Sequence, residues 1–299
     1  MTNSHECALG IDIGGTNTKV ALVARSGQVT ALESIPTSTA DAASHAPALV
    51  RRIAEAARRC LATRRVEAAG VAVAGFLDDA RESMCYNPNL PWLVDFPLRD
   101  ALSQSLAMPV LLEVDSNAAC LAEYQYGSGR GASRFLCLAS GTGLGGGMVA
   151  RGSLVRFTGQ CIGDVGHVVL DSDGPLCSCG GRGCAEALVA ESRIVRQAGC
   201  GPRLFDVIEA ARAGHLGALS ALEAAGRALG LAAASLAQIF QPDRIAFAGG
   251  LSEAGDLVLS AAQSAFRRNS STGNRDQVTL VKAALGWQAG VIGAAAPLL

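Results

Sequence analysis

Short hydrophobic runs that end in glycine-rich turns alternate along the chain with longer segments of helical periodicity. LGIDIGGTNTKVALV near the start and RFLCLASGTGLGGG at 134–147 each place strand-forming residues on both sides of a glycine turn, which predicts two hairpins. Continuous apolar runs predict buried strands at 69–75, 109–115 and 244–250. Helical spacing covers 43–63, 117–125, 185–198, 204–213 and 219–240, and the polar patch 267–277 is expected to be a loop. The pattern indicates an α/β protein.

The two hairpins resemble each other, although they lie far apart in the sequence. IDIGGTNTKVALV and LASGTGLGGGMVA at 138–150 both read as strand, Gly/Thr turn and second strand. At 299 residues the chain is longer than one typical domain core. We therefore expect two related lobes.

Composition and charge exclude several classes of partner. The chain has 25 basic and 26 acidic residues, which gives no electrostatic case for nucleic acid or an anionic membrane. No run of 18 apolar residues is visible, and MTNSHEC does not resemble a signal peptide, so we expect a cytoplasmic protein. Seven cysteines stand singly in apolar contexts and are expected to be reduced core residues: Cys7, Cys60, Cys85, Cys120, Cys137, Cys161 and Cys200.

Four potential metal ligands gather in the run GDVGHVVLDSDGPLCSCGGRGC. His167, Cys177, Cys179 and Cys184 form a Cys₃His set, which is typical of a closed structural zinc site. Cys177 and Cys179 are too close in sequence for an ordinary disulfide. The alternative is a group of unrelated thiols or part of a disulfide set.

The glycine turns suit phosphate binding, because glycine lets backbone N–H groups approach phosphate oxygens. In DIGGTN, Asp12 can hold magnesium through water, and Thr16 and Asn17 add hydrogen-bonding groups. SGTGLGGG at 140–147 offers a second anion site, and a glycine pair follows the strand at 244–250. Neither hairpin turn matches the Walker or dinucleotide fingerprints. Together they favour a nucleotide held between two lobes.

The ordered set of motifs resembles the ROK family (repressor, open reading frame, kinase) of actin-like ATPases over nearly the whole chain. The matching motifs are DIGGTN at 12–17, AVAG at 72–75, NPNLPW at 87–92, DSNAA at 115–119, SGTGLGGG at 140–147, DVGH at 164–167, CSCGGRGCAE at 177–186 and AGG at 248–250. The resemblance implies two ribonuclease-H-like α/β lobes with a structural zinc loop and with ATP and sugar in the cleft. The expected lobes are 1–118 with 286–299, and 119–285, since the last helix usually returns to the first lobe.

The resemblance also implies roles for individual residues. Kinase members transfer the γ-phosphate of MgATP to a sugar hydroxyl, usually on C6, with Asp115 as general base. A strand-end carboxylate suits that role, although Asp115 could instead cap the helix near Asn117. Asp164, His167 and Glu186 are expected to bind the sugar, together with Asn89. The residues expected to bind ATP and Mg²⁺ are Asp12, Gly14, Gly15, Thr16, Asn17, Lys19, Gly141, Thr142, Gly143, Gly249 and Gly250.

Two positions depart from the family pattern. Most family kinases have Asn immediately before the catalytic Asp, and this chain has Val114 there. They also have Glu as the first residue of an ExGH motif, and this chain has Asp164 there. An unpaired sugar hydroxyl costs about 1–3 kcal/mol, so these changes suggest a site refitted around C3 of the sugar. Kanosamine (3-amino-3-deoxyglucose) fits, because its ammonium needs acceptors, and it suggests a place in antibiotic biosynthesis. The alternatives are an ordinary glucokinase or an N-acetylmannosamine or N-acetylglucosamine kinase.

A sugar-sensing regulator is the competing class. Repressors of the family carry an N-terminal helix-turn-helix, and the first predicted strand here begins by Ala8, so we do not expect one. Asp12, Asp115 and both glycine turns favour the enzyme. Homodimers are usual in the family, and we expect one here.

Overall fold

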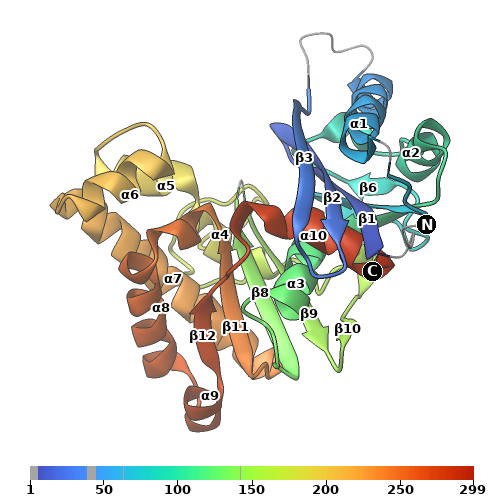
Figure 1. The fold of residues 1–299 in the computed structure, drawn as a ribbon. Coiled ribbons are helices and arrows are strands. Elements are labelled where there is room, and N and C mark those ends of the chain that lie inside the picture. The colour runs from blue at the N-terminus through green and yellow to red at the C-terminus, as the bar shows by residue number, and fades with distance from the viewer. Residues whose placement is uncertain (1–5, 39–44, 63, 142) are drawn as a thin grey trace. The chain divides into compact units, whose positions relative to one another are not determined.

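The chain forms two compact units in the computed structural model, which describes residues 6–38, 45–62, 64–141 and 143–299 (Figure 1). The first unit comprises Met1–Gly127, Leu154–Gly163 and Trp287–Leu299, and the second comprises Ser128–Ser153 and Asp164–Gly286. These bounds differ from the predicted lobes. The predicted division after residue 118 falls inside helix α3 (Asp115–Tyr126), which packs as a whole against first-unit elements.

A five-stranded sheet in the order β3-β2-β1-β4-β7 is the framework of the first unit. Its strands are β1 (Cys7–Ile13), β2 (Asn17–Ala24), β3 (Val29–Pro36), β4 (Ala69–Val73) and β7 (Val110–Val114). β1, β2 and β3 are antiparallel neighbours, whereas β4 pairs in parallel with both β1 and β7. Every residue of β4 is buried, as expected for a parallel strand covered on both faces. The predicted hairpin and both predicted strands are confirmed.

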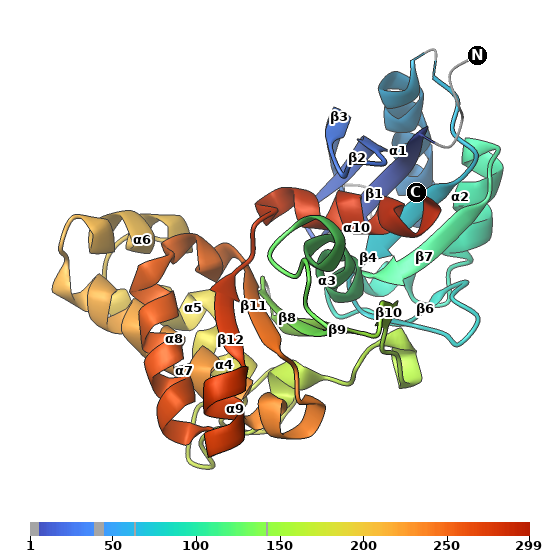
Figure 2. The same cartoon turned by 60° about the horizontal axis from the view of Figure 1, so that its bottom comes forward.

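Helices pack on both faces of this sheet. Alternate residues of β1, such as Leu9 and Ile11, share a core with α1 (His45–Leu61) and α2 (Leu98–Leu106). On the other face lies α10 (Ala289–Ala295), beside α3 (Figure 2). A Cβ atom on Gly70 of β4 would lie 1.7 Å from a carbonyl oxygen of α10, so only glycine permits this approach. The strand alternation therefore places Asp12 on the α10 face.

Short elements connect β4 to β7 and β9 to the second unit's helices. The first connection contains β5 (Phe76–Leu77), β6 (Met84–Tyr86) and η3 (Pro91–Leu93), and the second contains β10 (Ser153–Leu154), η4 (Thr158–Gln160) and η5 (Val165–His167). Two further short helices, η7 (Gly286–Gln288) and η8 (Ala296–Leu298), lie near the end of the chain. β5 and β6 pair as a small hairpin. Segment 154–163 belongs to the first unit because Arg156 and Gln160 bond to residues at the β7–α3 junction.

The second unit has its own five-stranded sheet in the order β10-β9-β8-β11-β12. Its longer strands are β8 (Arg134–Ser140), β9 (Leu144–Ala150), β11 (Arg244–Gly249) and β12 (Thr279–Lys282). β8 and β9 form the second predicted hairpin, and β8, β11 and β12 are parallel. The helices are α4 (Ala185–Val189), α5 (Glu191–Ala198), α6 (Leu204–Arg212), α7 (Leu216–Phe240), η6 (Gly250–Ala254), α8 (Asp256–Asn269) and α9 (Thr272–Gln277).

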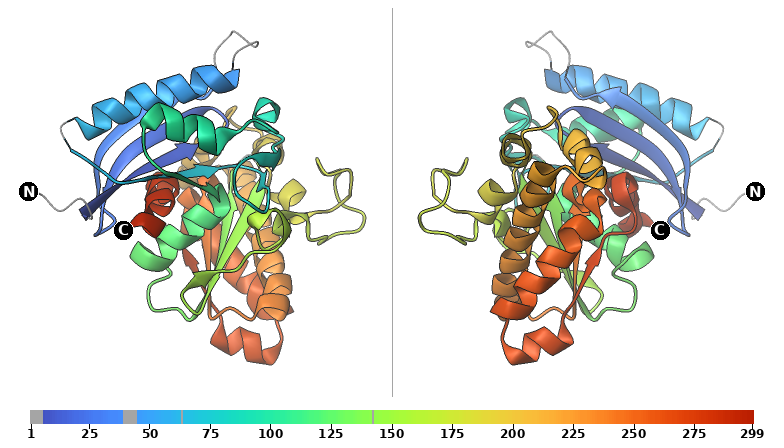
Figure 3. Two further views of the ribbon diagram at one scale, coloured as in Figure 1. Left: turned by 90° about the vertical axis from the view of Figure 1, so that its right-hand side faces the viewer. Right: turned by 90° about the vertical axis from the view of Figure 1, so that its left-hand side faces the viewer.

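Helix α7 packs along α8 (Figure 3). Glycines on α7 make the contact close: a Cβ atom on Gly230 would lie 2.2 Å from the carbonyl oxygen of Ala262. Among the described residues, α7 is the one helix long and apolar enough by composition to cross a membrane, and 56% of its most apolar window is buried. Its packing as a core helix accounts for that composition.

Three local predictions need correction. The polar patch 267–277 is not a loop, because α8 continues to Asn269 and the Ser271 hydroxyl caps α9 by accepting from the Asn274 N–H at 3.4 Å. The helix predicted over 185–198 is two helices divided at Ala190. Cys85 is exposed on the β5–β6 hairpin rather than buried in a core. None of the ten cysteines, all of which lie within the described residues, forms a disulfide, and Cys60, Cys120, Cys137 and Cys161 are buried as predicted.

Candidate functional site

The β1–β2 turn presents its outer side to solvent and is held from behind. Gly15, Thr16 and Asn17 are exposed. Thr37, fully buried, donates from Oγ1 to the Gly14 carbonyl oxygen at 2.6 Å, and its N–H donates to the Thr16 carbonyl oxygen at 2.9 Å. A fixed, exposed turn of this kind is suited to an anion.

Asp12 lies at the end of β1, beside this turn. Its carboxylate is 3.6 Å from the Lys19 ammonium, which also donates to the Trp287 carbonyl oxygen at 3.3 Å. Burial raises the pKa of Asp12 above its ordinary value, and Lys19 opposes that rise. A partly buried carboxylate of this kind gains from a second cation, so Asp12 fits the predicted magnesium contact.

Asn89 is exposed and lies close to the same turn. A Cβ atom on Gly15 would be 3.8 Å from the Cβ of Asn89. The loop carrying Asn89 is shaped by the buried Asn87, whose Oδ1 accepts from the N–H groups of Asn89 at 3.1 Å and Leu90 at 2.8 Å. Asn89 is thus placed beside the turn from a separate loop.

Asp115 stands where β7 ends and α3 begins. Its Oδ1 accepts from the Ser116 N–H at 2.7 Å, and Val114 rather than Asp115 is the residue that precedes the helix. Burial, and then the nearby charge of Asp12, raises the pKa of Asp115 to about 6, although backbone hydrogen bonds oppose the rise. A half-buried carboxylate with this pKa is ionised near neutral pH and still able to accept a proton.

A buried glutamate next to this position escaped the sequence analysis. Glu113 is 4% exposed, and its Oε2 receives both Arg81 at 3.3 Å and Arg156. Its Oε1 accepts from the Val114 N–H at 3.0 Å and from Asn117 Nδ2 at 2.8 Å. The glutamate therefore joins β7, the start of α3, the 78–83 turn and segment 154–163. An acid inside an apolar strand was the available signal.

In the second unit, two glycine turns lie at the ends of the paired strands β8 and β11. Gly249 pairs with Ser140, and a Cβ atom on Gly249 would be 1.8 Å from the Ser140 carbonyl oxygen. The Gly141 N–H donates to the Gly143 carbonyl oxygen at 2.8 Å. Gly250 follows at the start of η6. The predicted phosphate residues of this unit are thus brought together, except Thr142, which lies outside the described residues.

The four predicted metal ligands converge. The ligand atoms of His167, Cys177, Cys179 and Cys184 all lie within 4.8 Å of one another. His167 Nδ1 is 3.5 Å from Cys177 Sγ, and the sulfurs of Cys179 and Cys184 are 3.7 Å apart. Burial, with the neighbouring thiols, raises the pKa of Cys184 to about 12, so that thiol needs a cation to ionise. The geometry fits a single metal ion with four protein ligands.

Three of the predicted sugar-binding residues, Asp164, His167 and Glu186, gather around that cluster. The second ring nitrogen of His167, Nε2, faces Asp164 Oδ2 at 3.4 Å. Burial raises the pKa of Asp164; the His167 ring opposes the rise and the Glu186 carboxylate adds to it. Glu186 accepts from the Leu144 N–H at 2.9 Å and from the Ser178 hydroxyl at 2.9 Å. His167 therefore links the cluster of candidate metal ligands to Asp164, and Ser178 links the cysteine segment to Glu186.

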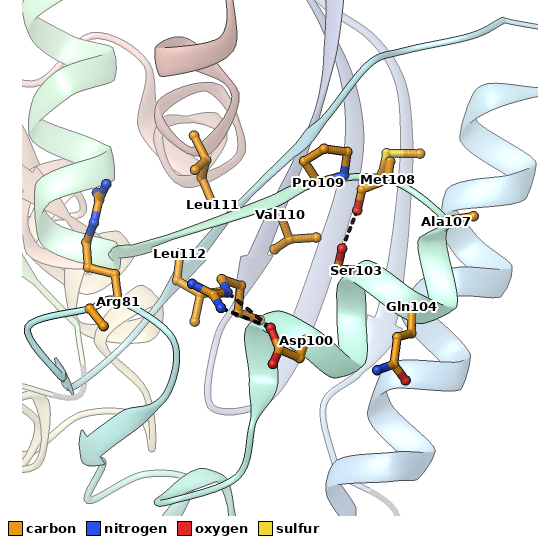
Figure 4. A pocket seen from close by; sticks show the side chains of 12 residues that line it. Arg81, Asp100, Ser103, Gln104, Ala107, Met108, Pro109, Val110, Leu111 and Leu112 are labelled. Atoms are coloured by element: carbon orange, nitrogen blue, oxygen red, sulfur yellow. Dashed lines mark hydrogen bonds and ion pairs between the residues drawn. The ribbon is translucent and has the colours of Figure 1, made fainter.

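A pocket of the first unit lies apart from these residues. It is lined by α2 and the outer edge of β7, with Ser103, Met108 and Leu111 among its residues (Figure 4). Arg81, one of its lining residues, also forms an ion pair with Glu113. None of the predicted site residues lines it.

Comparison with known proteins extends over the whole fold. The sequence profile of the ROK family matches residues 8–298. A glucokinase from Streptomyces coelicolor is 32% identical over 309 residues, covering 96% of each chain, and an N-acetylmannosamine kinase from Escherichia coli is 36% identical over 185 residues, covering 61% of this chain and 60% of that one. The structure of a ROK family glucokinase from Streptomyces griseus in complex with glucose and AMPPNP has a TM-score of 0.84 at 32% identity, covering 97% and 98% of the chains. The α/β fold is consistent with an actin-like ATPase.

Proposed function

The chain belongs to the ROK family, and we propose that it is a hexokinase-type sugar kinase that transfers the γ-phosphate of MgATP to the 6-hydroxyl of a hexose or aminohexose. The environment of Asp115 is the observation that carries the proposal. A half-buried carboxylate with a pKa of about 6, at the end of a strand and near Asp12, has the properties of a general base. The similarity to glucokinases over nearly the full length supports the same reaction.

In the proposed reaction Asp115 accepts the proton of the sugar hydroxyl as its oxygen attacks the γ-phosphorus. The bond to the β,γ-bridging oxygen breaks, and ADP leaves. Mg²⁺ bound with ATP would neutralise phosphate charge near Asp12. In the first unit, the exposed turn of Gly15, Thr16 and Asn17 would bind phosphate oxygens, with Lys19 as an additional cation.

We also propose that the cluster of His167, Cys177, Cys179 and Cys184 binds zinc. Three thiols and one imidazole are the ligands of a closed structural zinc site. His167 offers Nδ1 to this site while Nε2 faces Asp164, so the metal would fix the ring that addresses the sugar. Metal analysis of the purified protein tests this: one zinc per chain is expected.

The finer proposal concerns the sugar. Val114 is buried and its side chain offers no hydrogen bond, and Asp164 is one methylene shorter than glutamate. We infer a substrate altered at C3, with kanosamine favoured and a role in antibiotic biosynthesis. The alternatives are glucose, which the glucokinase relatives favour, and the N-acetylhexosamines. Steady-state phosphorylation of kanosamine, glucose, N-acetylglucosamine and N-acetylmannosamine discriminates among these substrates. A higher kcat/KM for glucose than for kanosamine contradicts the finer proposal.

A sugar-sensing regulator without catalysis is the alternative of another class. Coupled measurement of ADP release separates the two: sugar-dependent ADP release that Asp115→Asn abolishes supports the kinase. Sugar binding without turnover in the wild type supports the regulator.

We also propose that the protein is a homodimer in the cytoplasm. Light scattering of the purified protein tests whether it is a dimer.

A further inference from the structure

Glu186 accepts two hydrogen bonds of 2.9 Å from different segments of the second unit, besides a 4.0 Å contact from the Cys177 thiol. The Leu144 N–H, at the start of β9, donates to Oε2, and the Ser178 hydroxyl, in the cysteine segment, donates to Oε1, each at 2.9 Å. Bonds from two sides define the direction of a carboxylate that would otherwise turn freely. One of these two groups belongs to the turn assigned to the nucleotide.

Gly143 in that turn has no room for a side chain, and the obstacle is Glu186. A Cβ atom on Gly143 would lie 2.2 Å from Glu186 Oε2 and 3.1 Å from its Cδ. Gly141, two residues earlier, differs: a Cβ atom there would meet nothing within 4 Å. The space around the two positions therefore distinguishes them.

We propose that Gly143 and the Leu144 N–H are positioning groups for the sugar: the second glycine turn sets the orientation of the Glu186 carboxylate. The inference rests on the proposed function, in which Glu186 binds sugar hydroxyls. Because the carboxylate is the end of a flexible side chain, a methyl group at position 143 displaces it without requiring the backbone to move. A methyl group at position 143 is therefore expected to weaken sugar binding.

The test is sugar binding by calorimetry, without nucleotide, using glucose and kanosamine. Gly143→Ala is expected to weaken the better-bound sugar about tenfold or more, because an oriented charged hydrogen bond is lost. Ser178→Ala removes one of the two holding bonds and is expected to weaken binding several-fold. Gly141→Ala, the matched control, adds the same methyl group to the same turn and is expected to leave the sugar Kd unchanged. In steady state, Gly143→Ala raises the KM for sugar more than the KM for ATP.

A rescue distinguishes positioning from damage to the turn. Glu186→Asp shortens the side chain and makes room for the methyl group, so the double variant is expected to bind sugar as well as Glu186→Asp alone. Additive losses in this double-mutant cycle overturn the proposal, as does an unchanged sugar Kd for Gly143→Ala. Unchanged zinc content and thermal midpoint in Gly143→Ala exclude unfolding. Failure of the wild type to bind either sugar refutes the proposed function instead.

Discussion

Asp115→Asn is expected to abolish sugar phosphorylation and at the same time to stabilise the protein. Asparagine has nearly the same shape, and its Oδ1 can still accept from the Ser116 N–H. What disappears is a carboxylate whose ionisation is disfavoured by burial and by Asp12, as its pKa of about 6 shows. The group proposed to do the chemistry is therefore one that costs folding free energy.

The magnitude follows from the pKa shift. The rise from the ordinary value of 3.8 to about 6 is roughly two pKa units, and each unit is worth about 1.4 kcal/mol. Because the folded-state pKa is raised, the folded protein binds more protons than the unfolded chain between about pH 4 and pH 6. The unfolding free energy of the wild type falls across that window as pH rises. Asp115→Asn should gain up to about 3 kcal/mol near pH 7 and nothing below about pH 4.

Urea unfolding of both proteins at several pH values measures this gain. Asp79→Asn, on the exposed turn after β5, is the control for loss of one negative charge. The same pKa sets the activity: kcat/KM of the wild type should fall about tenfold per pH unit below about pH 6. A variant no more stable than the wild type near neutral pH, or equally stabilised in acid, refutes the reasoning.

Three further predictions concern the frame of the site. Glu113→Ala removes the carboxylate that pairs with Arg81 and Arg156, whose side chains are about one-third exposed. We expect the unfolding free energy, measured in urea, to fall by about 2–3 kcal/mol, and by less for Glu113→Gln; a fall below about 0.5 kcal/mol would contradict this. Removal of the metal by a chelator should lower the sugar affinity and the thermal midpoint together, measured by calorimetry and thermal unfolding, and readdition of Zn²⁺ should restore both. Gly70→Ala should lose about 1–3 kcal/mol, because the new methyl group meets the backbone of α10; a thermal midpoint equal to that of the wild type would show that the helix can move away.

Local chemistry explains which elements could be predicted. Both hairpins follow from strand-forming residues around glycine turns, and the strand at 69–75 from a continuous apolar run. The cluster of four candidate metal ligands was recognisable because a Cys-x-Cys pair leaves few alternatives. The prediction of a loop at 267–277 was wrong because a polar composition is typical both of a loop and of an exposed, capped helix. The Ser271 cap stabilises the helix here.

Contacts between distant segments could not be predicted. Nothing in the residues around Glu113 indicates that Arg156, which follows much later in the chain, would bond to it. The same holds for Gly143, which reads as one more phosphate-turn glycine until Glu186 is seen against it. Such pairs depend on how strands and helices pack, which a single sequence without its fold does not encode in any local pattern.

The sequence by itself determined the α/β class, the glycine turns and the candidate metal-ligand set, because each depends on residue types at short spacing, and its resemblance to the ROK family indicated the candidate base. The tertiary structure alone decided how these groups act on one another. It buried Asp115 near Asp12 and so raised its pKa, turned His167 between the cysteines and Asp164, and set Glu186 against a glycine. The physical reason is that pKa and orientation come from burial and from neighbours, and most of those neighbours are remote in the chain.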